Sequence, residues 1–171
     1  MIKFESKTTT LTFSAIVIAM YITVMYVTQS FAFGAYQIRL ATSLYALAYL
    51  FPFLIVPLGL SNFLSNFLGG LGIHDIIGGF IVGIVTSSAV YLIRRFNLPK
   101  VLIVPIIILG PGLIVPIWLS IILNIPYWLL ALNLCIGQTV PAVLGYLLIK
   151  ILSKLGSDTK NTVKERESYD E

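Results

Sequence analysis

Arg39 and Asp75 are two charged residues in an otherwise apolar chain, and their setting calls for a chemical explanation. Between residues 8 and 149 the only other charges form a basic cluster at residues 94–100. Ionisable groups at or inside a membrane are costly, so they indicate a function or a specific partner. A guanidinium offers five donors in a fixed fork, which suits a carboxylate or the acceptor edge of a heterocycle. Arg39 is therefore a candidate ligand-binding residue; the alternatives are an arginine reaching the lipid headgroups or a structural pair with Asp75.

Amide side chains supply further candidates. Asn62 and Asn66 are four residues apart, which places both on one face of a helix. Asn133 and Gln138 lie inside the last apolar run, and an amide offers donors and acceptors together, as the edge of a purine-like or vitamin-like molecule requires. For these amides the alternative is a hydrogen bond that joins two membrane helices. The candidate binding residues are Gln37, Arg39, Asn62, Asn66, Asp75, Asn133 and Gln138.

Enzymatic chemistry has few residues available in this sequence. Cys135 is the single cysteine and His74 the single histidine, so neither a disulfide nor a metal cluster is expected. The patterns G-x-x-x-x-G-K-[ST], H-E-x-x-H and G-x-S-x-G do not occur. We therefore expect no catalytic residues, no metal and no cofactor. An enzyme is the least favoured class of function.

The composition indicates an integral membrane protein. Of 171 residues, 58% are hydrophobic and 11% are charged, and the mean hydropathy is +0.97. Soluble domains carry about 25% charged residues. A net charge of +4 would suggest nucleic acid in a soluble protein. Here most basic residues flank apolar runs, as topology signals do, and no nucleic-acid partner is expected.

The apolar runs predict an all-α bundle of six transmembrane helices. A spanning helix needs about 20 apolar residues, and the run at 40–73 is too long for one helix and contains Pro52 and Pro57 near its middle. We expect two short helices there. Prolines and glycines inside the run at 101–123 predict a kink or break, and 124–126 reads as a turn. The expected spans are 11–29, two within 40–73, 76–93, 101–123 and 127–149.

Basic residues predict the orientation. With six spans, three basic groups, at residues 3–7, 94–100 and 150–154, fall on one side, and that side is expected to be cytoplasmic together with both termini. The expected organisation is a cytoplasmic segment at 1–10, a membrane domain at 11–154 and a charged, disordered cytoplasmic tail at 155–171.

Four stretches of the sequence form recognisable motifs. They are A-x-x-x-A from Ala15 to Ala19, F-G-A-Y-Q-I-R from Phe33 to Arg39, Gly59 to Asp75 with Gly78-Gly79, and N-I-P-Y-W from Asn124 to Trp128 through Gly137-Gln138. Together these stretches resemble the substrate-binding S components of energy-coupling factor (ECF) transporters, most closely the queuosine-precursor transporter family, QueT. The resemblance covers about residues 11–153. Thr42 and Gln138 depart from the family pattern, which commonly carries a glutamate at each position.

The resemblance implies a six-helix S-component bundle in the cell membrane with a ligand cavity open to the outside. Its solute would be a queuosine precursor, such as queuine or another 7-deazaguanine, or a related vitamin-like molecule. Ala15 and Ala19 would dock on the transmembrane coupling subunit. Two ATPase subunits would supply the energy with which the whole S component topples in the bilayer.

Two other functions compete with this interpretation. A self-sufficient secondary carrier would usually keep a titratable group near the midplane and show inverted repeats, and neither is evident in the sequence. A non-transporting membrane scaffold would use its polar residues for helix packing and would bind no small molecule.

Overall fold

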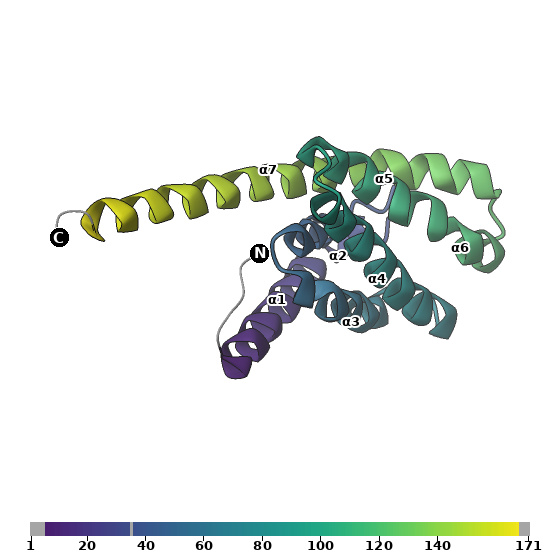
Figure 1. The fold of residues 1–171 in the computed structure, drawn as a ribbon. Coiled ribbons are helices and arrows are strands. Elements are labelled where there is room, and N and C mark those ends of the chain that lie inside the picture. Colours follow the sequence, from purple (N-terminus) through teal and green to yellow (C-terminus); the bar gives the residue numbers. More distant parts are fainter. Residues whose placement is uncertain (1–5, 35, 168–171) are drawn as a thin grey trace.

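Five apolar helices dominate the structure. The computed structural model describes residues 6–34 and 36–167, and every regular element within these ranges is helical (Figure 1). Five of its helical segments are long and apolar enough to cross a membrane, as predicted for an all-α membrane protein. These segments are α1 (Lys7–Val27), Pro52–Gly69 with α3 (Ile55–Asn66) at its centre, α4 (Ile73–Arg95), Lys100–Leu123 with α5 (Ile103–Ile114) and α6 (Pro116–Leu123), and α7 (Tyr127–Glu167), which qualifies as far as Gly156.

The other expected span is a short 3₁₀ helix, η1 (Leu40–Tyr49). At about 2 Å per residue its ten residues extend for about 20 Å, less than a hydrocarbon core of about 30 Å. It packs against α1, α4 and α7, and most of its side chains are buried. The close packing of η1 on α7 depends on Gly145, because the absence of a side chain there leaves room for the main-chain oxygen of Ser43. The short 3₁₀ segment η2 (Pro52–Leu54) then leads into α3, as the prolines predicted.

Glycines set the contact between α3 and α4, which run side by side (Figure 1). A Cβ atom placed on Gly83 would lie only 2.7 Å from the Cα atom of Gly59. The two backbones therefore meet directly, as small residues permit between membrane helices. This contact determines how closely the polar face of α3 approaches the first turns of α4.

The predicted break in the fifth run is confirmed. Helix α5 ends at Ile114 and α6 begins at Pro116, a first-turn position where the missing N–H costs nothing. Asn124 then ends α6 in the left-handed conformation, and the chain turns into α7. The hydroxyl of Tyr127 donates to the main-chain oxygen of Leu113 at 2.9 Å, which ties the start of α7 to α5.

Helix α7 continues well beyond the bundle (Figure 1). The sequence predicted a disordered tail from residue 155, whereas the structure is helical to Glu167, and residues 168–171 lie outside the described part. No proline or glycine interrupts the chain between residues 157 and 167, so the backbone can continue its hydrogen-bonding pattern. Pro141 also lies within α7 without ending it.

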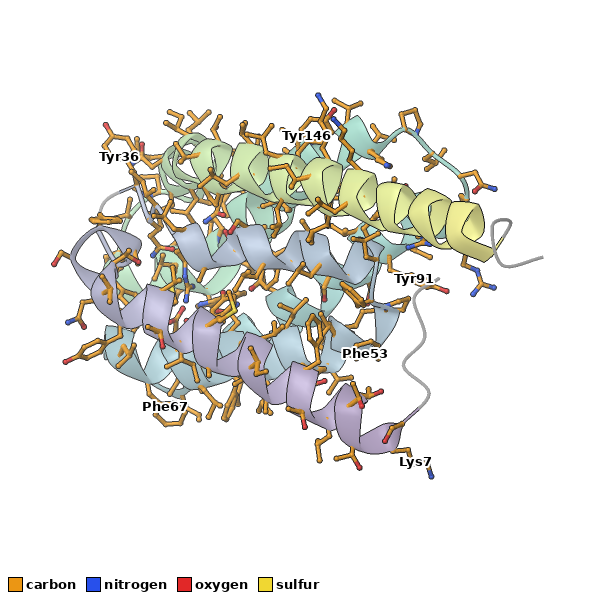
Figure 2. The ribbon with its side chains drawn as sticks, turned by 90° about the vertical axis from the view of Figure 1, so that its left-hand side faces the viewer. Lys7, Tyr36, Phe53, Phe67, Tyr91 and Tyr146 are labelled. Atoms are coloured by element: carbon orange, nitrogen blue, oxygen red, sulfur yellow. The ribbon has the colours of Figure 1, made fainter. Side chains whose placement is uncertain are left out.

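Two segments that carry candidate residues meet at one end of the bundle. Figure 2 shows Tyr36 and Phe67 at one end and Lys7 at the other. Tyr36 begins the short segment 36–39, called the strap below, which leads into η1. Phe67 begins the connection to α4, whose first turn contains Asp75.

Candidate functional site

Arg39 is the centre of a buried polar network. Its side chain is 5% exposed, and Nη2 donates to Asn62 Oδ1 at 3.0 Å and to Asn66 Oδ1. The ring of Phe33 lies 5.3 Å from the guanidinium carbon, within range of a cation–π interaction. The prediction that Asn62 and Asn66 share one helix face is confirmed, and that face points at Arg39.

Both amides are oriented by the backbone of α4. Asn62 Nδ2 donates to the main-chain oxygen of Gly79 at 2.7 Å, and Asn66 Nδ2 donates to that of Asp75 at 2.7 Å. Because each NH₂ group is used in this way, each Oδ1 atom faces the guanidinium. Gly79 makes the arrangement possible, since a Cβ atom there would overlap Asn66 Nδ2.

Asp75 is a buried carboxylate that does not pair with Arg39. Its side chain is 3% exposed, and Oδ1 accepts a hydrogen bond from Trp118 Nε1 at 3.0 Å. In the part of the chain that the structure describes, Oδ2 has no partner and no ion pair joins Asp75 to Arg39. The direct structural pair considered as an alternative is therefore not formed.

The strap is fastened to η1 and α7 by a second network. Thr42 Oγ1 lies 2.7 Å from the main-chain oxygen of Arg39 and 2.7 Å from Gln138 Oε1. Gln138 Nε2 donates to the main-chain oxygen of Gln37 at 3.3 Å. Gln37 itself has a positive φ of 44°, a conformation that needs support from its surroundings. Gly137 allows the strap to lie on α7, because a Cβ atom there would overlap the main-chain oxygen of Tyr36.

A cavity of about 270 Å³ lies beside the strap. This volume is close to the lower end of the range for ligand pockets, about 300–1,000 Å³. Its polar side chains are Gln37 and Asn133, two of the predicted binding residues. The remaining wall is apolar and consists of Phe33, Gly34, Leu71, Leu119, Leu123, Ile125, Leu129, Leu130 and Leu134.

The predicted residues thus form two neighbouring groups that share the strap. Arg39, Asn62, Asn66 and Asp75 form the buried network, whereas Gln37 and Asn133 line the cavity. Gln138 is 1% exposed and supports the strap without lining the cavity. Phe33 connects the groups, because its ring contacts Arg39 and also forms part of the cavity wall.

Sequence reasoning missed the role of Trp118. It lies 43 positions from Asp75, and nothing in the spacing of the two residues indicates their contact. The nearest sequence signal was Gly78-Gly79, since a Cβ atom on Gly78 would lie 2.5 Å from the Trp118 ring. Glycine pairs in a membrane helix favour close approach of a neighbouring group.

Ala15 and Ala19 lie on an exposed face of α1, away from the polar network. Ala19 borders an open groove together with Ile16, Met20, Thr23 and Val24. Ile16 and Met20 are 51% and 50% exposed, which leaves this face of α1 available to lipid or to a partner helix. Among the described residues, no group of three or more His, Cys, Asp or Glu side chains forms a metal site.

Comparison with known proteins places the chain in a family. The family model for the QueT transporter matches residues 11–154. This range contains the cavity, every residue of both polar networks and the five long helices except for the start of α1 and the end of α7. A search of curated proteins and a search of solved structures each found no match.

Proposed function

The chain belongs to the QueT transporter family, and on this premise we propose that it is the solute-binding S component of an ECF-type importer. It is a multi-pass membrane protein, and we propose that η1 completes six membrane segments with both termini in the cytoplasm. The segment at 1–10 and the extension of α7 beyond residue 154 would then lie on the cytoplasmic side. The cavity and the strap would lie toward the outside.

The proposed solute is a queuosine precursor, such as queuine or another 7-deazaguanine, or a related vitamin-like heterocycle. The observation that carries this proposal is the cavity in which Gln37 and Asn133 present amides opposite apolar walls. A planar heterocycle has apolar faces and a polar edge, so it matches such a lining. Phe33 would offer a ring face to the solute, and its ring also lies near the guanidinium of Arg39.

We propose that Arg39 and its network position the strap and supply a donor to the solute. Arg39 Nε is buried without a hydrogen-bond partner, which is costly unless another group completes it. An acceptor on a heterocycle would do so. Asn62, Asn66 and Gln138 would hold the geometry, and Asp75 would provide an acceptor of opposite charge.

The energy for transport would come from other subunits. In this proposal the face of α1 at Ala15 and Ala19 docks on a transmembrane coupling subunit, and two ATPase subunits drive toppling of the loaded chain. Both residues are exposed in the monomer, as a docking surface requires. The sequence has no phosphate-binding loop of the G-x-x-x-x-G-K-[ST] type, which is compatible with this division of labour.

Solute binding by the purified protein tests the proposal. Queuine, 7-deazaguanine, related purines and several vitamins are titrated, with binding measured by thermal shift and tryptophan fluorescence. We expect one of the deazaguanines to bind, and Arg39→Ala to weaken binding about 10- to 100-fold, the effect of a lost hydrogen bond to a charged group. Arg94→Ala is the matched control, because Arg94 bonds to the main-chain oxygen of Tyr49 outside both networks. Failure of every heterocycle to bind would overturn the proposal.

A further inference from the structure

Tyr49, the last residue of η1, holds two cations near one aromatic ring. The guanidinium carbon of Arg94 lies 5.7 Å from the ring centroid, and Nζ of Lys100 lies 5.9 Å from it. Arg94 Nη1 also donates to the main-chain oxygen of Tyr49 at 3.1 Å, which fixes the arginine beside the ring. An aromatic ring attracts each cation, but two like charges brought to the same ring repel one another. An anion bound by both cations would offset that repulsion.

No acidic partner for these cations is present among the side chains that the structure describes. The sequence has no Asp or Glu between Asp75 and Asp158. Asp75 lies in the first turn of α4 and Arg94 in its last turn, so about 30 Å of helix separates them. Within the described part of the chain Arg94 makes one side-chain hydrogen bond, which leaves its other N–H donors for a further acceptor. The planar fork of a guanidinium matches two oxygens of a phosphate.

Helix capping does not account for this pair of cations. The turn after α4 already uses a terminal carbonyl, because the N–H of Leu98 donates to the main-chain oxygen of Ile93 at 2.8 Å. The negative end of the α4 dipole favours Arg94, whereas Lys100 begins the helical segment Lys100–Leu123, an end where the dipole disfavours a cation. The two basic residues therefore come together for a reason other than the helix ends that carry them.

Exposed apolar side chains lie in the same turn as the cations. Phe96 is 64% exposed and Val101 is 56% exposed, on either side of the exposed Leu98. Figure 2 shows Tyr91 of α4 at the same end of the bundle as Lys7 and away from the strap. Basic and apolar side chains mixed in this way suit the boundary between lipid headgroups and acyl chains. A small soluble anion would leave the apolar residues of the turn without a role.

We propose that Arg94, Lys100 and the ring of Tyr49 form a binding site for the phosphate of an acidic phospholipid headgroup. Arg94 donates to two phosphate oxygens, and Lys100 approaches the same phosphate as a point charge. The Tyr49 ring keeps the two cations close together, while Phe96 and Val101 contact the first carbons of the acyl chains. The site lies at the end of η1 that is remote from the strap, so it is separate from the proposed solute site and does not depend on it.

Lipid binding to the full-length protein in a neutral detergent tests the proposal by native mass spectrometry. The probes are phosphatidylglycerol and phosphatidylcholine with identical acyl chains, and inorganic phosphate as the soluble anion. We expect one phosphatidylglycerol to bind about 10-fold or more tightly than phosphatidylcholine, because basic residues near a membrane surface attract acidic headgroups. Inorganic phosphate at the same concentration should not displace the lipid, since it has no acyl chains to contact the turn.

Charge variants separate this site from the general positive charge of the surface. Arg94→Gln combined with Lys100→Gln should weaken binding of phosphatidylglycerol about 10- to 100-fold, the effect of lost hydrogen bonds to charged groups, and should leave phosphatidylcholine unaffected. Lys7→Gln combined with Lys150→Gln is the matched control. It removes the same number of positive charges from the other two basic groups that are predicted to lie on this side of the membrane. The control pair should retain the preference for the acidic lipid.

Variants of Tyr49 test the ring without a change in charge. Tyr49→Phe keeps the ring face and should bind phosphatidylglycerol as the parent protein does. Tyr49→Leu should weaken that binding several-fold, since Arg94 and Lys100 lose the ring that holds them together. A thermal melt of each variant establishes that it is folded.

Three results would overturn the proposal. The first is equal affinity of the parent protein for the two lipids. The second is an equal loss of preference in the Arg94–Lys100 pair and the Lys7–Lys150 pair, which would assign the preference to general surface charge. The third is displacement of phosphatidylglycerol by an equal concentration of inorganic phosphate, which would indicate a site for a free anion.

Discussion

Thr42 and Gln138 are joined by a hydrogen bond of 2.7 Å although 96 positions separate them in the sequence. They are the two positions expected from the sequence to depart from the family resemblance, and here a hydroxyl and an amide meet. The amide also donates to the main-chain oxygen of Gln37. This pair therefore attaches the strap to α7 and fixes the approach of Arg39 to its network.

Removal of the Thr42 hydroxyl should loosen the strap. Thr42→Val keeps the shape of the side chain but leaves Gln138 Oε1 without the hydroxyl beside it, whereas the main-chain oxygen of Arg39 still accepts from the backbone N–H of residue 42. We expect the folded state to lose about 1–3 kcal/mol, the cost of a buried polar group left unpaired. Thermal unfolding in detergent measures the change. Thr42→Ser retains the hydroxyl and should lose much less, so equal destabilisation by both variants would contradict this role.

A methyl group on Gly79 should displace the amide of Asn66. The added Cβ atom of Gly79→Ala would overlap Asn66 Nδ2, and the helices α3 and α4 would have to separate. Overpacking of this kind typically costs about 1–3 kcal/mol. Gly156→Ala is the matched control, because nothing lies within 4 Å of the added atom in α7. The control should be neutral or slightly stabilising in a thermal melt, since alanine favours helix.

The solute affinity of the Gly79→Ala variant provides a second measurement. If Asn66 helps to hold Arg39, weaker solute binding should accompany the lower melting temperature. Normal affinity in a destabilised protein would show that the amide serves only the packing of α3 on α4.

Loss of the Asn66 side chain should remove one hydrogen bond from each of two buried groups. Asn66→Ala removes one of the two acceptors of Arg39 Nη2, leaving Asn62 Oδ1, and the side-chain donor to the main-chain oxygen of Asp75. The hydrogen bond to the guanidinium alone is worth about 1.5–3 kcal/mol. A thermal melt should therefore show a clear decrease in stability. Ser61→Ala, on the same helix, removes only a hydroxyl that bonds to the main-chain oxygen of Pro57, and its effect should be small.

Local patterns predicted much of the fold and part of the site. Helix periodicity placed Asn62 and Asn66 on one face, and the structure shows both at Arg39. Proline position predicted the break between α5 and α6 and the separation of η1 from α3. These features depend on residues that are close in sequence, where spacing determines geometry directly.

Contacts between distant segments could not be predicted in the same way. Trp118 reaches Asp75 only because α4 and α6 pack together at Gly78, and this packing depends on the arrangement of the whole bundle. The 3₁₀ form of η1 was equally inaccessible, since its apolar residues are compatible with an α-helix. The length of α7 was underestimated because a charged composition indicates solvation but does not prevent helix formation.

Bulky residues on the exposed face of α1 should leave solute binding unchanged and prevent transport. Ala15→Trp and Ala19→Trp enlarge exposed side chains that contact neither polar network, so the purified protein should bind solute with unchanged affinity. If this face docks on a coupling subunit, the same variants should fail to co-purify with that subunit and should not support uptake. Small residues allow close helix approach, and a large side chain prevents it.

Val140→Trp provides the control for a nonspecific effect of a large side chain in the bilayer. Val140 is 51% exposed on α7, a different face of the bundle, so its replacement should preserve co-purification and uptake. Loss of uptake in all three variants would indicate a general defect in membrane insertion. Normal uptake by Ala15→Trp and Ala19→Trp would place the docking surface elsewhere, because a close helix contact cannot accommodate two indole rings.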